Sequence, residues 1–246
     1  MTASLNTTTS APKQVLLVVA NPSVSTTLGI PVGFWGSELT HAWLTFAEAG
    51  YEVTIASPEG GKVELDALSD PREPSGYSAW DLITMGFLNT PSLAALLEDT
   101  PRLADLDLDE YDALVVAGGQ SPMFTFRSNG DLQAAIRTFY EAEKPTAALC
   151  HGVSALIDVR LADGSYLIDG RTVTGFANVE EAEADAIVGT QVMPWHIEDA
   201  ARERGANYVE GGKWKPFAVR DGRLITGQQQ YSGKRTAELV VEALGV

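Results

Sequence analysis

The stretch KPTAALCHGVSAL, residues 144–156, holds the only cysteine of the chain. Residues 145–150 form a short apolar run, which is typical of a buried parallel strand. After Cys150 the chain continues through His151 and Gly152 into VSALID, where the pattern becomes helical. The sequence therefore predicts that a strand ends at the thiol and that a helix begins directly after it.

The same alternation extends in both directions along the 246 residues. Apolar or alternating runs predict further strands at 14–21, 51–58, 111–119, 171–176 and 223–228. Helical spacing of apolar residues predicts helices at 37–50, 130–144, 178–187, 193–206 and 232–245. Strands and helices in turn indicate an α/β, doubly wound fold, in which a mostly parallel sheet carries helices on both faces.

The place of Cys150 at the end of a strand bears on function. In open α/β sheets, ligands bind in the crevice beyond the carboxyl ends of the strands. A sharp strand-to-helix turn presents its side chain to that crevice, which makes a nucleophile elbow with sulfur in place of a serine hydroxyl. N–H groups at a helix start favour an anion, so we expect a lowered pKa for the thiol. The alternative is a buried structural cysteine, since cysteine is among the most buried residue types.

Composition narrows the possible partners. The formal charge of −16 repels phosphate backbones and anionic lipids, so we expect neither nucleic acid nor a membrane as a partner. One cysteine and three histidines at unrelated spacings predict no metal site. The glycine pairs at 60–61 and 118–119 match no nucleotide-binding motif, so no cofactor is expected.

The start of the chain, MTASLNTTTSAP, is small and polar, without the basic and apolar parts of a secretory signal. We expect a flexible tail over residues 1–13 and a single domain over residues 14–246. A lone cysteine forms no internal disulfide, which favours the cytoplasm.

Six short motifs identify a family. They are GSE (36–38), EAGYEVTIASPEGG (48–61), AGGQSP (117–122), ALCHG (148–152), TGFANVEEA (174–182) and DGRLITGQ (221–228). Together they resemble the ThiJ/PfpI superfamily, whose fold is flavodoxin-like and is shared with class I glutamine amidotransferases. The last two motifs are similar to the branch that holds glutathione-independent glyoxalases (glyoxalase III) and related heat-shock chaperones. The resemblance runs from about residue 14 to the C-terminus.

The resemblance implies roles for particular side chains. Cys150 is the nucleophile, His151 is the acid/base group beside it, and Glu38 is the carboxyl group that points at the sulfur. Glu181 orients the histidine, with Glu180 as the alternative. A carboxylate beside a thiolate repels it, so the two groups titrate as a unit and we expect Glu38 to be neutral.

Glycines complete the expected site. Gly118, Gly119 and Gly152 are expected to bind the substrate oxygen, with backbone N–H groups of Gly119 and Cys150 as the donors. Where the branch commonly has His-Gly after the paired glycines, this chain has Gln120-Ser121-Pro122, which leaves the substrate preference open.

Structural readings compete with these roles. Glu38 would also favour a helix start through the helix dipole. The acidic run Glu180, Glu181 and Glu183 would also suit a solvated helix face. His41 and His196 match no motif and are expected to be structural.

The function that the resemblance implies is a cofactor-independent glyoxalase, which converts methylglyoxal, a small 2-oxoaldehyde, to D-lactate through a cysteine hemithioacetal. One alternative is another hydrolase or hydratase with the same site, such as a peptidase, a deglycase-like enzyme or an isocyanide hydratase. Another is a stress chaperone or thiol redox sensor. The resemblance also implies a homodimer.

Overall fold

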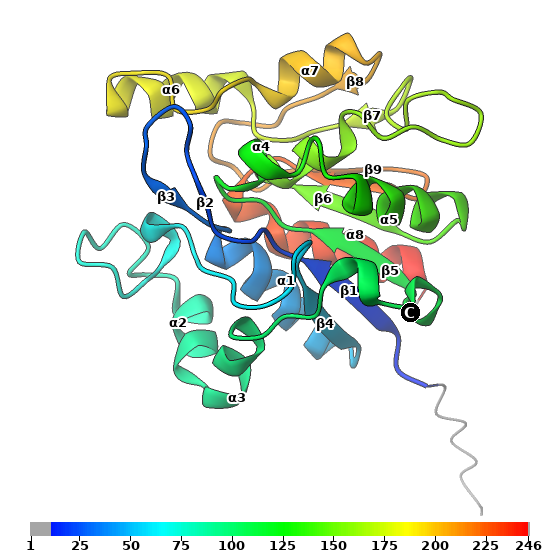
Figure 1. Cartoon of the computed structure of the whole chain (residues 1–246), viewed down its shortest axis with the longest axis horizontal. Helices are drawn as coiled ribbons and strands as arrows, with labels where there is room; N and C mark the ends of the chain where they lie inside the picture. The colour runs from blue at the N-terminus through cyan, green and yellow to red at the C-terminus, as the bar shows by residue number, and fades with distance from the viewer. Residues whose placement is uncertain (1–10, 246) are drawn as a thin grey trace, which may run out of the picture.

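A six-stranded sheet with the order β4-β1-β5-β6-β10-β9 lies at the centre of the computed structural model, which describes residues 11–245 (Figure 1). The strands are β1 (Gln14–Val18), β4 (Glu52–Ala56), β5 (Ala113–Val116), β6 (Thr146–Leu149), β9 (Ala218–Asp221) and β10 (Leu224–Gly227). All neighbouring pairs are parallel except β10 and β9. The expected mostly parallel sheet is therefore confirmed. Most of the tail expected at 1–13 lies outside the described residues.

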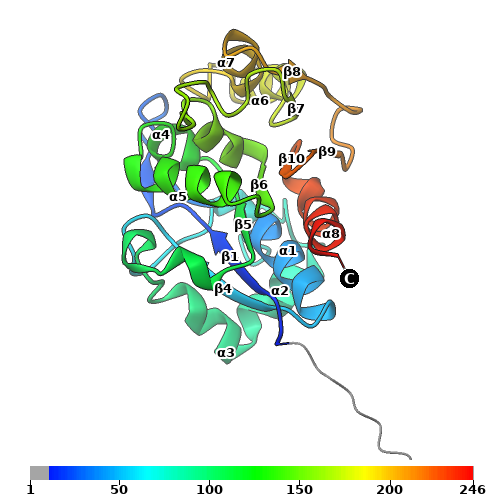
Figure 2. The same cartoon turned by 90° about the vertical axis from the view of Figure 1, so that its right-hand side faces the viewer.

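The sheet is buried on both faces, and β1 shows why its sequence is apolar throughout. Val15 and Leu17 point into one core, while Leu16 and Val18 point into the other. The first core is closed by α1 (Gly36–Glu48) and α8 (Gly233–Leu244), and the second by α5 (Gly130–Glu141). Figure 2 shows α5 on one side of the sheet and α1 and α8 on the other, as expected of a doubly wound fold.

One predicted strand lies elsewhere. Of residues 171–176, only β7 (Thr172–Val173) is a strand, and it pairs with β8 (Asn207–Tyr208) in a separate two-stranded sheet. After β7, the backbone N–H groups bond to side chains and not to a neighbouring strand. Thr174 N donates to Thr226 Oγ1, and Gly175 N donates to the Tyr208 hydroxyl. This small sheet lies beside α7 (Ile197–Glu203) in the upper part of Figure 1, and α7 in turn contacts α6 (Asn178–Val188).

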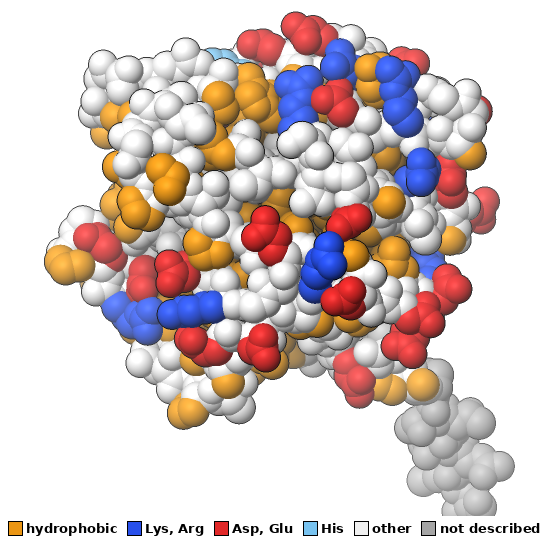
Figure 3. Space-filling model, in the orientation of Figure 1, with side chains coloured by type: hydrophobic (Ala, Val, Ile, Leu, Met, Phe, Trp, Pro, Cys, Tyr) orange, Lys and Arg blue, Asp and Glu red, His pale blue; other side chains and the backbone are white. Residues whose placement is uncertain are grey.

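The remaining elements are short. They are β2 (Ser23–Val24), β3 (Pro31–Val32), α2 (Leu82–Asn89), α3 (Pro91–Ala94), α4 (Pro122–Thr125), and the 3₁₀ helices η1 (Ala67–Ser69), η2 (Ala95–Leu97), η3 (Leu103–Asp105), η4 (Leu108–Glu110), η5 (Cys150–Leu156) and η6 (Gln230–Ser232). Within residues 11–245, no helix combines the length and apolar character that a membrane crossing requires. On the face seen in Figure 3, lysines and arginines are interleaved with acidic side chains.

Candidate active site

A strained turn carries the thiol. Cys150 follows the last residue of β6 and has a φ of 54°, in the left-handed region that side chains rarely adopt. The chain continues directly into the 3₁₀ helix η5, so the expected helix is present in its tighter form. Because strain of this kind concentrates at functional sites, the turn supports the reading of Cys150 as a nucleophile elbow.

The segment that follows β5 packs closely against this turn. A Cβ atom on Gly118 would lie 2.6 Å from Gly152 N and 2.7 Å from His151 N. A Cβ atom on Gly152 would lie 2.6 Å from the carbonyl oxygen of Val116. Neither position has room for a side chain, and the close approach brings the Gly118–Gly119 backbone next to the sulfur.

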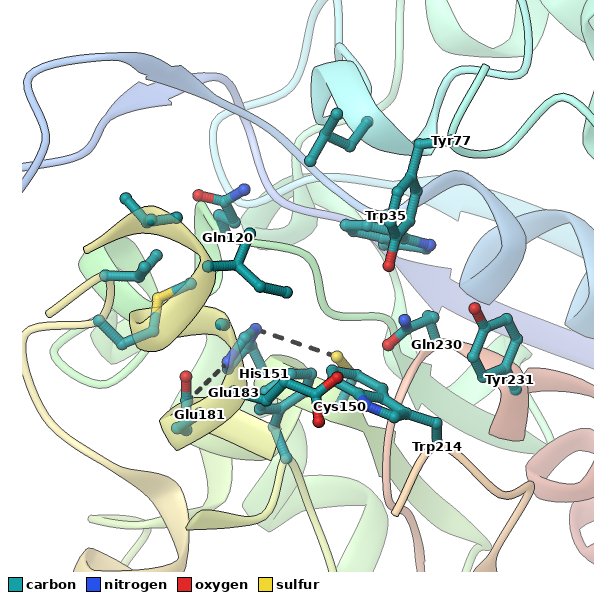
Figure 4. A pocket seen from close by; sticks show the side chains of 17 residues that line it. Trp35, Tyr77, Gln120, Cys150, His151, Glu181, Glu183, Trp214, Gln230 and Tyr231 are labelled. Carbon is teal, nitrogen blue, oxygen red and sulfur yellow. Dashed lines mark hydrogen bonds and ion pairs between the residues drawn. The ribbon is translucent and has the colours of Figure 1, made fainter. Parts of the chain in front are cut away.

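A histidine links the thiol to a buried carboxylate. The Nδ1 atom of His151 lies 3.9 Å from Cys150 Sγ, and its Nε2 atom lies 3.0 Å from Glu181 Oε1 (Figure 4). Phe176 stacks on the imidazole, with 4.2 Å between the ring centroids. The ring is held on one face and at both nitrogens, so its orientation is fixed.

Glu180 has a different set of contacts. Its carboxylate accepts from Ala177 N at 3.2 Å, from Trp214 N at 2.9 Å and from Gln228 Nε2 at 3.0 Å. It therefore holds three segments together and does not contact the histidine. Glu180 and Glu181 are both buried, so the reading of these two as a solvated helix face is wrong.

Glu38 is fully buried beside the thiol. Its Oε2 atom accepts from Gly118 N at 2.7 Å, while its Oε1 atom is buried near the Cys150 thiol with no hydrogen-bond partner among the described residues. Complete burial raises the pKa of Glu38 from 4.5 to about 8, and the nearby Asp66 adds to the rise. The carboxyl group is therefore protonated at neutral pH, which agrees with the expectation from the sequence.

The pKa of the Cys150 thiol differs from the prediction. Burial raises the pKa of Cys150 well above its ordinary value, and the adjacent Glu38 carboxyl raises it further. The backbone N–H groups of His151 and Gly119 near the sulfur oppose the rise in pKa, but loss of solvent outweighs them. The prediction of a lowered pKa is therefore wrong, because a short turn supplies too few donors for a fully buried sulfur. The resting form is the thiol, and attack requires a base.

The three glycines expected at the substrate oxygen have different roles in the structure. The N–H of Gly119 lies near the sulfur, where it can serve as a donor to an oxygen on a carbon atom bound there. The N–H of Gly118 is already used by Glu38, so this group is not a free donor for substrate. Gly152 provides the close approach to β5 described above.

Asp66 is a buried acid that the sequence analysis missed. It accepts from Gly33 N at 2.8 Å and from Gln120 N at 2.6 Å, and so ties two loops together behind the thiol. Burial raises its pKa to about 6. The segment VELDALSD contains no pattern that distinguishes this acid from its neighbours, and only the fold brings it beneath the site.

A cavity of about 500 Å³ opens above Cys150. Several segments distant in sequence line it, and the aromatic residues among them are Trp35, Tyr77, Phe176, Trp214 and Tyr231. Sequence reasoning identified none of these, because single aromatic residues in loops carry no periodic signal. Gln120 also lines the cavity, so the departure at 120–122 does reach the site.

The other two histidines lie outside this cavity. His41 Nε2 is 2.8 Å from Asp81 Oδ1, and His196 Nδ1 is 3.8 Å from Asp199. Across residues 11–245, no cluster of three or more His, Cys, Asp or Glu side chains has an arrangement suited to a metal ion.

Comparison with known proteins places this site in a family. Residues 92–243 match the model of the DJ-1/PfpI family. The chain belongs to the DJ-1/PfpI family. This confirms the ThiJ/PfpI resemblance and the fold that it implied.

Several DJ-1/PfpI relatives align over nearly the whole chain. The glutathione-independent glyoxalase HSP31 of Saccharomyces cerevisiae is 31% identical, over 95% of this chain and 99% of its own length. The crystal structure of glyoxalase III from Candida albicans has a TM-score of 0.79 and 27% identity, over 94% of this chain and 97% of its own. Rapid Encystment Protein 24 KDa of Francisella tularensis has a TM-score of 0.84 and 30% identity, over 95% of this chain and all of its own.

Proposed function

We propose that this protein is a glutathione-independent glyoxalase, which converts methylglyoxal and water to D-lactate with Cys150 as the nucleophile. The observation that carries the proposal is the buried row of a protonated carboxyl, a thiol, an imidazole and a carboxylate formed by Glu38, Cys150, His151 and Glu181. Such a row supplies one nucleophile and two proton carriers. Similar proteins named as glutathione-independent glyoxalases support the choice of reaction.

The first step forms a bond from sulfur to carbon. His151 accepts the thiol proton while Sγ attacks the aldehyde carbon, which gives a hemithioacetal. Glu181, with Oε1 3.0 Å from Nε2, stabilises the imidazolium that forms. The distance of 3.9 Å between Sγ and Nδ1 is compatible with this proton transfer, because catalytic hydrogen bonds are often long in the absence of substrate.

In the second step, the carbon that bears sulfur is oxidised and the adjacent carbon is reduced. A proton leaves the carbon that bears sulfur, an enediol forms, and a proton is added to the adjacent carbon. The first carbon is thereby oxidised to a thioester while the second is reduced to an alcohol, so no external oxidant is consumed. His151, neutral again once it has returned the thiol proton to the alkoxide oxygen, accepts the proton from the first carbon and passes it to the second. Glu38, neutral and next to the sulfur, donates a proton to the neighbouring carbonyl oxygen as the enediol forms and recovers one from the hydroxyl group of the first carbon as the thioester forms. Water then hydrolyses the thioester, which releases lactate and restores the thiol.

The test is a product assay. Wild-type protein incubated with methylglyoxal and no added thiol is expected to form D-lactate, measured with a D-specific lactate dehydrogenase. Cys150→Ala is expected to form none above the uncatalysed rate, whereas Trp80→Leu, at an exposed position outside the cavity, is expected to match wild type. D-lactate formation by Cys150→Ala at the wild-type rate would overturn the proposal.

We also propose a single domain over residues 14–246, a homodimer and a cytoplasmic location. One sheet with a core on each face supports the single domain. Twofold dimers are the commonest closed assembly, and a lone cysteine suits a reducing compartment. Cooperative unfolding in one transition, a dimer mass in solution by light scattering and cell fractionation are the respective checks.

A further inference from the structure

The cavity above Cys150 is large for methylglyoxal. At about 500 Å³ it falls within the range of roughly 300–1,000 Å³ that encloses drug-sized ligands. Methylglyoxal carries only a methyl group beside its two carbonyl groups. With its carbonyl groups at the sulfur, most of the cavity would remain filled with water.

The walls of the cavity are mostly apolar. Trp214 meets Phe176 edge to face at 5.8 Å between ring centroids, and Phe176 in turn stacks on His151. Across the thiol, Tyr77 meets Trp35 edge to face at 6.2 Å. In Figure 4, Cys150 lies between Trp214 on one side and Trp35 and Tyr77 on the other. Flat or bulky apolar groups bind well between such rings, whereas a methyl group contacts few of their atoms.

Charge in the cavity selects against anions. Its acidic lining residues are Glu181, which pairs with His151, and Glu183, which pairs with Lys213. Among the described residues, no lysine or arginine lines it. A substrate with a carboxylate or phosphate would leave that charge without a partner.

We propose that this site takes neutral 2-oxoaldehydes with a bulky apolar or aromatic substituent, and that the two aromatic pairs bind the substituent. The inference rests on the proposed glyoxalase reaction and names its substrate class. An arylglyoxal follows the same chemistry as methylglyoxal, since the aldehyde carbon is oxidised, the neighbouring carbon is reduced, and water releases an aryl hydroxy acid.

The kinetic test compares phenylglyoxal with methylglyoxal. One methylene in an apolar pocket is worth about 10- to 200-fold in kcat/KM, so phenylglyoxal is expected to exceed methylglyoxal at least about tenfold. Because the aldehydes differ in intrinsic reactivity, the decisive quantity is the change of this ratio in variants. Trp214→Leu is expected to lower the ratio roughly three- to tenfold, while Trp80→Leu, a tryptophan that is 91% exposed and outside the cavity, leaves it unchanged. An equal effect of Trp214→Leu on both substrates would overturn the inference.

A surface variant covers the case in which Trp214→Leu does not fold. Ile187 lines the mouth and is 79% exposed, so Ile187→Lys does not disturb the core. Wild type is expected to prefer phenylglyoxal to 4-carboxyphenylglyoxal, and Ile187→Lys to reduce that preference about two- to fivefold at low salt. Equal turnover of the two aryl substrates by wild type would contradict the charge argument.

A binding experiment tests the substrate class independently of the proposed reaction. Diketones lack the aldehyde hydrogen and cannot be turned over, but they can protect Cys150 from iodoacetamide. 1-Phenyl-1,2-propanedione is expected to protect at a concentration at least about tenfold lower than 2,3-butanedione. Aromatic protection without turnover of either aldehyde would refute the reaction and keep the substrate class. Turnover of methylglyoxal with no aromatic preference in either arm would refute only the class.

Discussion

At the scale of single residues, the site depends on which groups hold protons at neutral pH. Burial keeps Glu38 protonated up to about pH 8 and also favours the neutral thiol of Cys150. Both groups therefore begin the reaction as acids, and His151, oriented by Glu181, is the nearby base. This division of roles differs from a site built around a preformed thiolate.

Glu38→Gln tests the proton carrier. Glutamine keeps the shape and a hydrogen-bond donor but cannot exchange a proton. We expect kcat to fall roughly 10²–10⁴-fold, the usual contribution of a positioned acid or base, with KM little changed. Steady-state kinetics on methylglyoxal checks this, with Glu38→Asp as a test of placement. Near-wild-type turnover in Glu38→Gln would leave proton transfer to His151 alone.

Alkylation of Cys150 tests the raised pKa of the thiol. Since burial and Glu38 both disfavour the thiolate, the rate with iodoacetamide is expected to rise only above the pKa of a free cysteine, about 8.5. In Glu38→Gln no carboxylate forms beside the sulfur, so the midpoint of the rate profile is expected at lower pH. A midpoint well below 8.5 in wild type would contradict this account and restore the reading of a preformed thiolate.

At the scale of elements, the site is a close contact between two strand ends. Gly118, just after the end of β5, and Gly152, after the end of β6, allow the approach. Gly118→Ala requires backbone movement, so we expect a loss of roughly 1–3 kcal/mol in the free energy of unfolding and a loss of turnover. Gly86→Ala is the matched control, because a Cβ at this position of α2 meets nothing within 4 Å and favours the helix by roughly 0.5–1 kcal/mol. Urea denaturation measures both changes, and a neutral Gly118→Ala would refute the packing argument.

These elements also show which parts of the fold and the site the sequence predicts. The buried strands β1 and β6 are short apolar runs, so the sequence pattern alone predicted them. The edge strand β9, with the sequence AVRD, is only partly buried and has no such pattern, and it was missed. The motifs predicted Cys150, His151 and Glu181 as residues of the site. Asp66 and Trp214 reach the site only through tertiary contacts between distant loops, which the motifs do not show.

At the scale of the whole molecule, the buried acid links stability to pH. The pKa of Glu38 rises from 4.5 to about 8, so the folded protein binds a proton that the unfolded chain releases within this window. Stability from this group is complete below about pH 4.5 and is lost as pH rises through 8. Relative to Glu38→Gln, wild type is expected to lose on the order of 3 kcal/mol between pH 5 and pH 8. Urea unfolding at both pH values measures this, with the exposed Glu98→Gln as control; parallel curves for wild type and Glu38→Gln would contradict the raised pKa.

The most direct measurement of the central claim is to trap the covalent intermediate. Wild-type protein mixed with methylglyoxal without glutathione is quenched in acid within a turnover, digested and examined by mass spectrometry. The account predicts a lactoyl group on the peptide that contains Cys150, appearing before D-lactate and absent from Cys150→Ala. D-lactate that accumulates in wild type while the Cys150 peptide stays unmodified at every time point would contradict it.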